Sequence, residues 1–214
     1  MLTLKCNSVD TGDKGLGHAK CQSAGYYRYG KQLMKRMIAA SGFALLAGCA
    51  TTQNDLPTQS DLDLDKYAGT WFEQARLPNR FQKDCIGEVR ADYTLKPNNR
   101  LEVVNQCKAR DGSVKTAGGE GRLNPSFAPP DPARLEIRFA PQWTSWIPMV
   151  WGDYWIIRVA GDYNHSLVGT PDRKYLWVLS RQRTADAASV QALLDYAATL
   201  GFATDDIRRT SSQQ

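Results

Sequence analysis

The chain has 214 residues and a formal net charge of +5 at pH 7, from 27 Lys and Arg against 22 Asp and Glu. Residues 1–48 hold seven of the 27 basic residues and two of the 22 acidic ones, so residues 49–214 carry 20 of each and no net charge. A neutral body excludes the basic surface that nucleic-acid-binding proteins use. About 150 residues suit one folded domain with its own core.

Residues 34–48 have the organisation of a secretory signal peptide, with a basic start at Lys35-Arg36, an apolar run and then small residues. The apolar run is shorter than the roughly 20 residues that a permanent membrane span needs. It ends at Leu46-Ala47-Gly48-Cys49, which resembles the bacterial lipobox. By that resemblance Cys49 receives acyl chains and anchors the protein to a membrane. The alternative is an ordinary signal peptide followed by a chance cysteine.

The segments on either side of this signal have different expected roles. Residues 1–33 precede a complete signal that has its own methionine, Met34, so we interpret them as an upstream extension from a start codon placed too early; a long charged lead-in is the alternative. Residues 49–62 are polar and broken by proline, which predicts a flexible tether. Ala50, rather than Asp, follows Cys49, which resembles lipoproteins of the outer membrane. The expected location is therefore that membrane, facing the periplasm.

Residues 63–183 predict an all-β domain. In the stretch that starts at Gly69, Trp71, Glu73, Ala75 and Leu77 share one face, which is the period of two of a β-strand. About eight short alternating segments follow one another, and this number suits a barrel or a sandwich. A closed barrel is favoured because closure removes exposed strand edges.

A helix is expected after the last strand, in a C-terminal segment of residues 184–214. Residues 184–200 place Val190, Leu193, Leu194 and Ala197 on one helical face, and Gly201 follows as a C-cap. We expect this apolar face to pack on the outside of the barrel.

Three short motifs together resemble the sequence signatures of the lipocalins, and especially of the bacterial outer-membrane lipocalin lipoproteins. The motifs are Gly69-Thr70-Trp71-Phe72-Glu73, then Asp162-Tyr163, and finally Thr170–Arg181. The resemblance covers roughly residues 63 to 210 and implies an eight-stranded up-and-down antiparallel barrel, or calyx, with the helix outside. It also implies that Gly69, Trp71 and Arg181 close the base of that barrel.

The resemblance implies a hydrophobic ligand, and strand alternation then predicts the side chains that line its cavity. We expect the lining to be Tyr93, Leu95, Val103, Phe139, Trp155, Ile157 and Trp177, with Phe81, Trp143 and Trp146 near the mouth. Such a wall suits the acyl chain of a fatty acid or a lysophospholipid. Residues 140–152 are unusually aromatic, and two interpretations stay open: a loop packed over the barrel, or a lip that contacts lipid.

The mature chain contains one histidine, His165, and no motif places a nucleophile, a base and a metal cage together. We therefore expect no enzyme activity, no metal and no cofactor, and we expect His165 to be a solvent-exposed turn residue. Glu73 is expected to be a hydrogen-bonded polar group inside the calyx. An enzyme that acts on a lipid or isoprenoid, and an envelope scaffold that binds nothing, remain alternatives. The sequence leaves the ligand's identity and the formation of a homodimer open.

Cys85 and Cys107 would be exported into an oxidising space, where a disulfide can persist. The simplest hairpin register puts Cys85 a few residues beyond the partner of Cys107. We therefore predict a disulfide that requires the chain to bend near Gly87, so that the two Cα atoms come within about 7 Å.

Overall fold

The computed structural model of the chain describes residues 56–210, which belong to a single compact unit. The predicted extension, the signal peptide, the first half of the tether including Cys49, and the last four residues of the tail lie outside the described residues. Between residues 56 and 210, no helix is both long enough and apolar enough to cross a bilayer.

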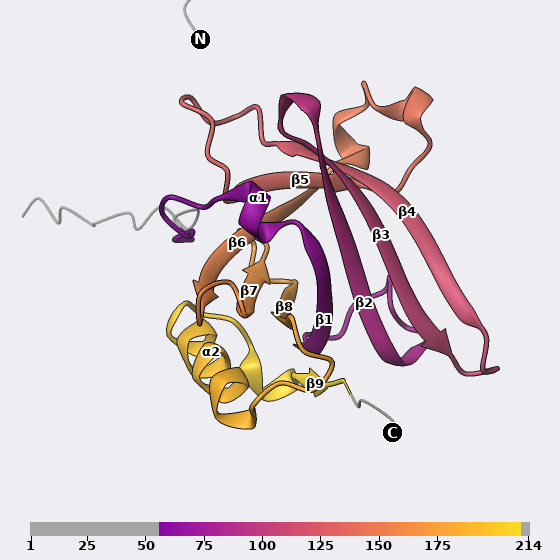
Figure 1. Cartoon of the computed structure of the whole chain (residues 1–214), viewed down its shortest axis with the longest axis vertical. Helices are drawn as coiled ribbons and strands as arrows, with labels where there is room; N and C mark the ends of the chain where they lie inside the picture. Colours follow the sequence, from indigo (N-terminus) through magenta and orange to yellow (C-terminus); the bar gives the residue numbers. More distant parts are fainter. Residues whose placement is uncertain (1–55, 211–214) are drawn as a thin grey trace, which may run out of the picture. The chain divides into compact units, whose positions relative to one another are not determined.

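The described chain forms a closed antiparallel barrel in which each strand pairs with the next (Figure 1). The strands are β1 (Gly69–Arg76), β2 (Cys85–Lys96), β3 (Arg100–Ala109), β4 (Val114–Leu123), β5 (Arg134–Arg138), β6 (Gly152–Ala160), β7 (His165–Gly169) and β8 (Leu176–Ser180). Because β1 pairs with both β2 and β8, the sheet closes on itself. The expected eight-stranded up-and-down barrel is confirmed, and β9 (Arg208–Arg209) adds a short edge to β1.

Short helices connect or cap these strands. They are the α-helices α1 (Leu64–Tyr67) and α2 (Ala187–Thr199), and the 3-10 turns η1 (Pro97–Asn99), η2 (Gln142–Thr144), η3 (Pro148–Val150) and η4 (Thr204–Asp206). The Asp63 carboxylate caps α1 by accepting hydrogen bonds from the backbone N–H groups of Asp65 and Lys66. The tight turn from β2 to β3 places Asn98 and Asn99 at positive φ, which asparagine tolerates better than most residues.

Helix α2 packs on the outside of the barrel, as the sequence predicts. Asp186 caps its first turn through the Ser189 N–H, and Gly201 follows its end at a φ of +86°. The expected apolar face of α2 is buried against outward-facing strand residues such as Ala75, Leu167 and Val178. Each large apolar side chain buried there contributes about 1.5–3 kcal/mol.

The described part of the expected tether is packed on the barrel. Leu56 is fully buried in the cluster beneath α2, and Leu62 is buried in the cluster inside the barrel. Between them, the Gln59 backbone N–H donates to the carbonyl of Ile156 at 2.8 Å. Residues 56–62 therefore belong to the folded domain rather than to a flexible linker.

Two apolar clusters follow from this arrangement, one on each side of the barrel wall. The inner cluster contains Leu62, Leu64, Tyr67, Trp71, Tyr93, Leu101, Val103, Ala133, Leu135, Ile156, Val168 and Leu179. The outer cluster lies between the wall and α2. Strands β6, β7 and β8 contribute to both clusters, so these strands are apolar on both faces.

Candidate functional site

Three of the expected residues meet at the base of the barrel. The guanidinium carbon of Arg181 lies 3.8 Å from the centre of the fully buried Trp71 ring. Arg181 also donates to the backbone carbonyls of Lys66 at 2.6 Å and Thr70 at 3.0 Å. Gly69 has a φ of +98°, and a Cβ there would lie 3.3 Å from Arg181 Nη1. Burial lowers the pKa of Arg181, but arginine stays charged in proteins.

Two buried tyrosines, Tyr67 and Tyr93, and the partly buried Tyr154 lie next to this base, and we call them the tyrosine floor. The Tyr154 hydroxyl is hydrogen-bonded to the hydroxyls of Tyr93 at 2.8 Å and Tyr67 at 3.3 Å. Tyr67 continues the chain of hydroxyls to Ser166 Oγ at 3.1 Å. Burial raises the pKa of Tyr67 to about 12 and the pKa values of Tyr93 and Tyr154 further. The floor is therefore polar but uncharged at neutral pH.

The inner wall includes four of the side chains that the sequence assigns to a cavity. Tyr93 and Val103 are buried in the inner cluster, and Leu95 and Trp177 pack against it. Tyr93 faces Val103, and Leu95 faces Leu101, across the β2–β3 pair. Apolar and polar residues alternate clearly along β2 and β3, because one face of these strands meets the barrel interior and the other carries polar side chains.

The expectation that Trp155 and Ile157 line the cavity is wrong. Both residues are buried in the outer cluster under α2, whereas Ile156 lies in the inner cluster. The register between β6 and β7 shifts between Ile156 and Arg158, so Ile157 and Arg158 both face outward. Arg158 itself lies 3.6 Å from the centre of the Tyr196 ring of α2. The sequence pattern could not show which residues of β6 face inward, because both faces of this strand are apolar.

Three aromatic side chains form a stack at the end of the barrel where β1 leads into β2, and we call them the aromatic rim. Phe81 lies 5.5 Å from the ring of Tyr175, which stacks on Trp177 at 6.0 Å between ring centres. The stack runs from the inner wall at Trp177 to Phe81, which is 64% exposed. The expected place of Phe81 near a mouth agrees with this geometry.

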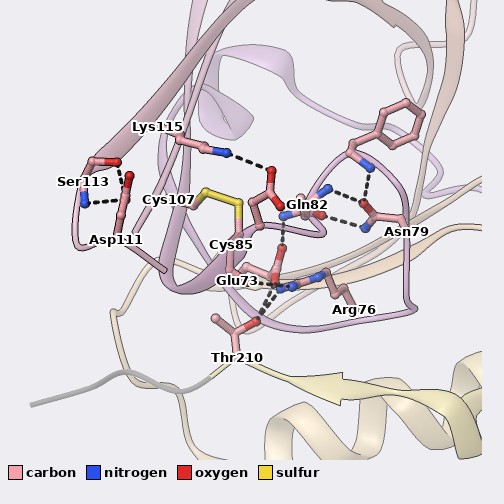
Figure 2. Close-up of a disulfide and its surroundings, with 12 residues drawn as sticks. Glu73, Arg76, Asn79, Gln82, Cys85, Cys107, Asp111, Ser113, Lys115 and Thr210 are labelled. Carbon is pink, nitrogen blue, oxygen red and sulfur yellow. Dashed lines mark hydrogen bonds and ion pairs between the residues drawn. A yellow bond between two sulfur atoms is a disulfide. The ribbon is translucent and has the colours of Figure 1, made fainter. Parts of the chain in front are cut away.

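Glu73 stands in a hydrogen-bond network below this rim (Figure 2). Its carboxylate is buried and pairs with Arg76, and it accepts hydrogen bonds from Gln82 at 2.6 Å and from the Thr210 hydroxyl. The side-chain carbonyl of Gln82 in turn accepts from the Trp177 indole at 2.9 Å. Glu73 therefore holds the β1–β2 loop against the barrel wall, and both of its carboxylate oxygens are engaged in these hydrogen bonds.

The predicted disulfide joins Cys85 to Cys107, with a Cα–Cα distance of 5.6 Å. The β2–β3 register shifts on both sides of Gly87, which supplies the expected bend. Beside the disulfide, Lys115 Nζ lies 2.8 Å from the Asp84 carboxylate (Figure 2). This ion pair links β4 to the β1–β2 loop at the same end of the barrel as the aromatic rim.

The aromatic segment between β5 and β6 lies apart from this rim. Its first residues, 139–142, line a cleft of ≈ 680 Å³ with Lys96 and Pro97 at the β2–β3 turn, and in Figure 1 the orange segment between β5 and β6 and this turn both lie at the top of the view. Because Cys85 and Lys96 are opposite ends of β2, the expectation that Trp143 and Trp146 share a mouth with Phe81 is wrong. Sequence pattern does not specify the direction in which a long loop folds.

The same segment combines a packed anchor with exposed tips. The Trp151 ring lies 3.9 Å from the Arg122 guanidinium and 5.2 Å from that of Arg138, while Trp143 and Trp146 are 75% and 77% exposed. Phe139 is 47% exposed, and its ring covers Gly119, where a Cβ would lie 2.7 Å away. Packing therefore accounts for Trp151 but not for the exposed tryptophans.

Comparison with known proteins agrees with this architecture. A family model described as a lipocalin-like domain matches residues 62–212. The chain is a lipocalin. Members of this family typically bind small hydrophobic ligands.

Several relatives of this lipocalin are similar over most of their length. Temperature-induced lipocalin-1 of Arabidopsis thaliana is 31% identical over 75% of this chain and 84% of its own. Outer membrane lipoprotein Blc of Escherichia coli K12 is 31% identical over 80% and 92%, and apolipoprotein D of Macaca fascicularis is 32% identical over 72% and 78%.

Solved structures show the same fold. Insecticyanin of the tobacco hornworm Manduca sexta has a TM-score of 0.57 at 19% identity, with 75% of this chain and 86% of that chain covered. H1 crustacyanin from the lobster Homarus americanus has a TM-score of 0.55 at 18% identity, with coverage of 77% and 87%.

Sequence reasoning missed most of the tyrosine floor of this lipocalin. Tyr67 belongs to the short helix α1, and Tyr154 has the strand parity opposite to the one expected to face inward. Tyr67 follows Lys66 and Tyr154 follows Asp153, so the local sequence gives no signal that their hydroxyls meet across the barrel.

His165 also differs from its expected place. It is the first residue of β7 and is half-buried, beside a hollow of ≈ 410 Å³ between the wall and α2. Within residues 56–210, no three His, Cys, Asp or Glu side chains are grouped so that they could hold a metal ion.

Proposed function

We propose that this lipocalin holds one single-chain lipid, a fatty acid or a lysophospholipid, inside its barrel. The observation that carries the proposal is the incomplete filling of the inner wall between the tyrosine floor and the aromatic rim. Ala91 lies beside the buried Trp71 on this wall, and Ala117 faces the same interior through β3. Ala91 is partly exposed where it packs against the inner cluster, and Ala117 is exposed together with the rest of residues 114–118, so this part of the wall is open to solvent.

The energetics favour an acyl chain in that space. Each buried methylene contributes about 0.8 kcal/mol, so a long chain offsets the cost of association. The carboxylate or phosphate of the ligand then lies at the wet end of the barrel, near Lys115. The uncharged tyrosine floor provides no cation for a buried carboxylate, which favours entry with the chain end first.

The proposed site of action is the periplasmic face of the outer membrane, with Cys49 as the acylated anchor. Support comes from the lipobox at residues 46–49 and from bacterial relatives named as outer membrane lipoproteins. Cys49→Ser should release the protein from membrane fractions into the soluble periplasmic fraction, whereas Ala50→Ser should leave it membrane-bound. A Cys49→Ser protein that still fractionates with the outer membrane contradicts the anchor.

The experiment that tests ligand carriage is mass spectrometry of lipid extracted from protein purified without added lipid. A single-chain lipid bound in stoichiometric amount supports the proposal. Chemical conversion of an added lipid would favour an enzyme, and a barrel that neither contains nor takes up lipid would favour a scaffold. An unfolded sample, which should carry no lipid, is the control for nonspecific adsorption.

A further inference from the structure

The three most exposed large apolar side chains among residues 56–210 all lie on the aromatic segment between β5 and β6 (Figure 1). They are Trp143, Trp146 and Met149, of which Met149 is 89% exposed, and we call them the exposed tips. Residues 139–151 contain no charged side chain. Exposed apolar patches of this kind mark sites where a protein contacts another protein or a membrane.

Hydrogen bonds within the segment fix the backbone that presents the tips. The hydroxyl and the backbone N–H of Thr144 both donate to the carbonyl of Pro141, at 2.6 and 2.9 Å. The Trp151 indole donates to the carbonyl of Ser145 at 2.8 Å, and its ring packs against the Arg122 guanidinium. Because the backbone between these contacts is already ordered, the tips lose little conformational freedom when they bind a partner.

The charged side chains beside the segment are paired with one another. Lys96 Nζ lies 2.7 Å from the Glu102 carboxylate. Glu120 pairs with Arg100 at 2.5 Å and with Arg138 at 2.6 Å. All five of these residues line the cleft next to the segment. Each basic group there has an acidic partner, so the surface favours a zwitterionic or uncharged partner over a strongly charged one.

The length of chain before the described residues favours a bilayer as that partner. Leu56 is buried in the outer cluster, and Cys49 lies seven residues earlier, a length of chain that spans at most about 25 Å. With Cys49 acylated as proposed, Leu56 stays within that distance of the bilayer, and the domain has only to turn to bring the aromatic segment onto the same surface. Tryptophan is enriched at membrane–water interfaces because its ring is apolar and its N–H is polar.

We propose that the exposed tips insert into the interfacial layer of a zwitterionic bilayer, so that the β2–β3 turn end of the barrel docks on the membrane surface. The choice of a bilayer rests on the proposed anchor at Cys49. Three inserted side chains give reversible binding, comparable with the roughly 10⁴ M⁻¹ of a single myristoyl chain. The acyl anchor therefore retains the protein at the membrane and the tips orient it, and without the anchor the contact is lost on dilution.

The test is vesicle binding by the Cys49→Ser protein from the soluble periplasmic fraction, which carries no acyl chain. Phosphatidylcholine vesicles should sediment half of this protein at about 0.1 mM accessible lipid and shift its tryptophan emission to shorter wavelength. Adding Trp143→Ser and Trp146→Ser should weaken the binding by about tenfold or more, because most of the inserted apolar area is removed. Replacing a third of the lipid with phosphatidylglycerol should change the affinity by no more than about twofold, since the adjacent charges are paired.

Phe81→Ser/Val114→Ser is the matched control, because it removes two exposed apolar side chains that lie outside the aromatic segment; it should bind vesicles as the Cys49→Ser parent does. Thermal midpoints check that each variant is folded. Absence of binding, equal loss in the two double variants, or binding only to vesicles with phosphatidylglycerol overturns the inference and leaves lipid carriage and the Cys49 anchor standing. A parent that forms a dimer through the tips, is made monomeric by the tryptophan substitutions and does not bind vesicles also overturns it.

Discussion

The guanidinium carbon of Arg181 lies over the Trp71 ring, 3.8 Å from its centre, and so joins the end of the last barrel strand to the start of the first. The same guanidinium donates to the carbonyls of Lys66 and Thr70, on either side of the junction between α1 and β1. One side chain therefore holds together the three segments that close the base of the barrel.

Replacement of Arg181 should destabilise the fold more than its surface position would indicate. A desolvated cation–π contact contributes about 2 kcal/mol, and hydrogen bonds from a charged group add more, so Arg181→Met should lower the free energy of unfolding by about 3 kcal/mol. Arg183→Met is the matched control, since Arg183 is mostly exposed, its ion pair with Glu88 is long at 3.8 Å, and its cation–π contact with Phe72 is longer than that of Arg181, at 5.1 Å; it should cost less than about 0.5 kcal/mol. Urea denaturation measures both, and equal effects would contradict the role given to Arg181.

The Cys85–Cys107 disulfide should contribute to stability because it closes a loop of 22 residues in the unfolded chain. In the chain-entropy model such a bond contributes about 3 kcal/mol. The double variant Cys85→Ser/Cys107→Ser should show this loss in urea denaturation. Addition of a reductant should lower the stability of the wild-type protein and leave that of the double variant unchanged. Two free thiols in non-reduced, alkylated wild-type protein would contradict the bond.

The tyrosine floor should make the protein sensitive to alkali. Burial raises the pKa of Tyr67 from 10.0 to about 12, so its contribution is fully present below pH 10 and is lost as the pH rises toward 12. In that interval the unfolded tyrosine releases its proton and the folded one keeps it, which lowers the free energy of unfolding by about 1.4 kcal/mol per pH unit for each such tyrosine.

Denaturation curves between pH 9 and pH 12 test this prediction. Tyr67→Phe should show a shallower alkaline loss of stability, by about 1.4 kcal/mol per pH unit, whereas Tyr175→Phe at the aromatic rim should follow the wild-type curve. Identical slopes for wild type and Tyr67→Phe would mean that the Tyr67 hydroxyl does not resist ionisation in the folded protein.

The sequence was most informative where one strand face is polar and the other apolar. The β2–β3 hairpin, with Tyr93 opposite Val103, follows from alternation alone, and the Trp71–Arg181 contact follows from motifs whose residues meet only in the closed barrel. The same reasoning assigned the inward face of β6 wrongly. Helix α2 covers the outer face of this strand, so both faces are apolar, and the bulge after Ile156 changes which residues face inward.

Tertiary contacts explain the remaining differences. The three hydroxyls of the tyrosine floor come from α1, β2 and β6, so no local pattern brings them together.

The central claim, that the barrel binds an acyl chain, is tested most directly by titrating delipidated protein with fatty acids of increasing chain length while recording tryptophan fluorescence. The account predicts a saturable change and an affinity that rises with each added methylene, by up to about fourfold for a fully buried group. Trp177→Phe should lose most of the change because Trp177 packs against the inner cluster, whereas Trp155→Phe should keep it because Trp155 lies under α2. A flat titration at micromolar ligand, or an affinity that does not depend on chain length, would contradict lipid carriage and favour a scaffold that binds nothing.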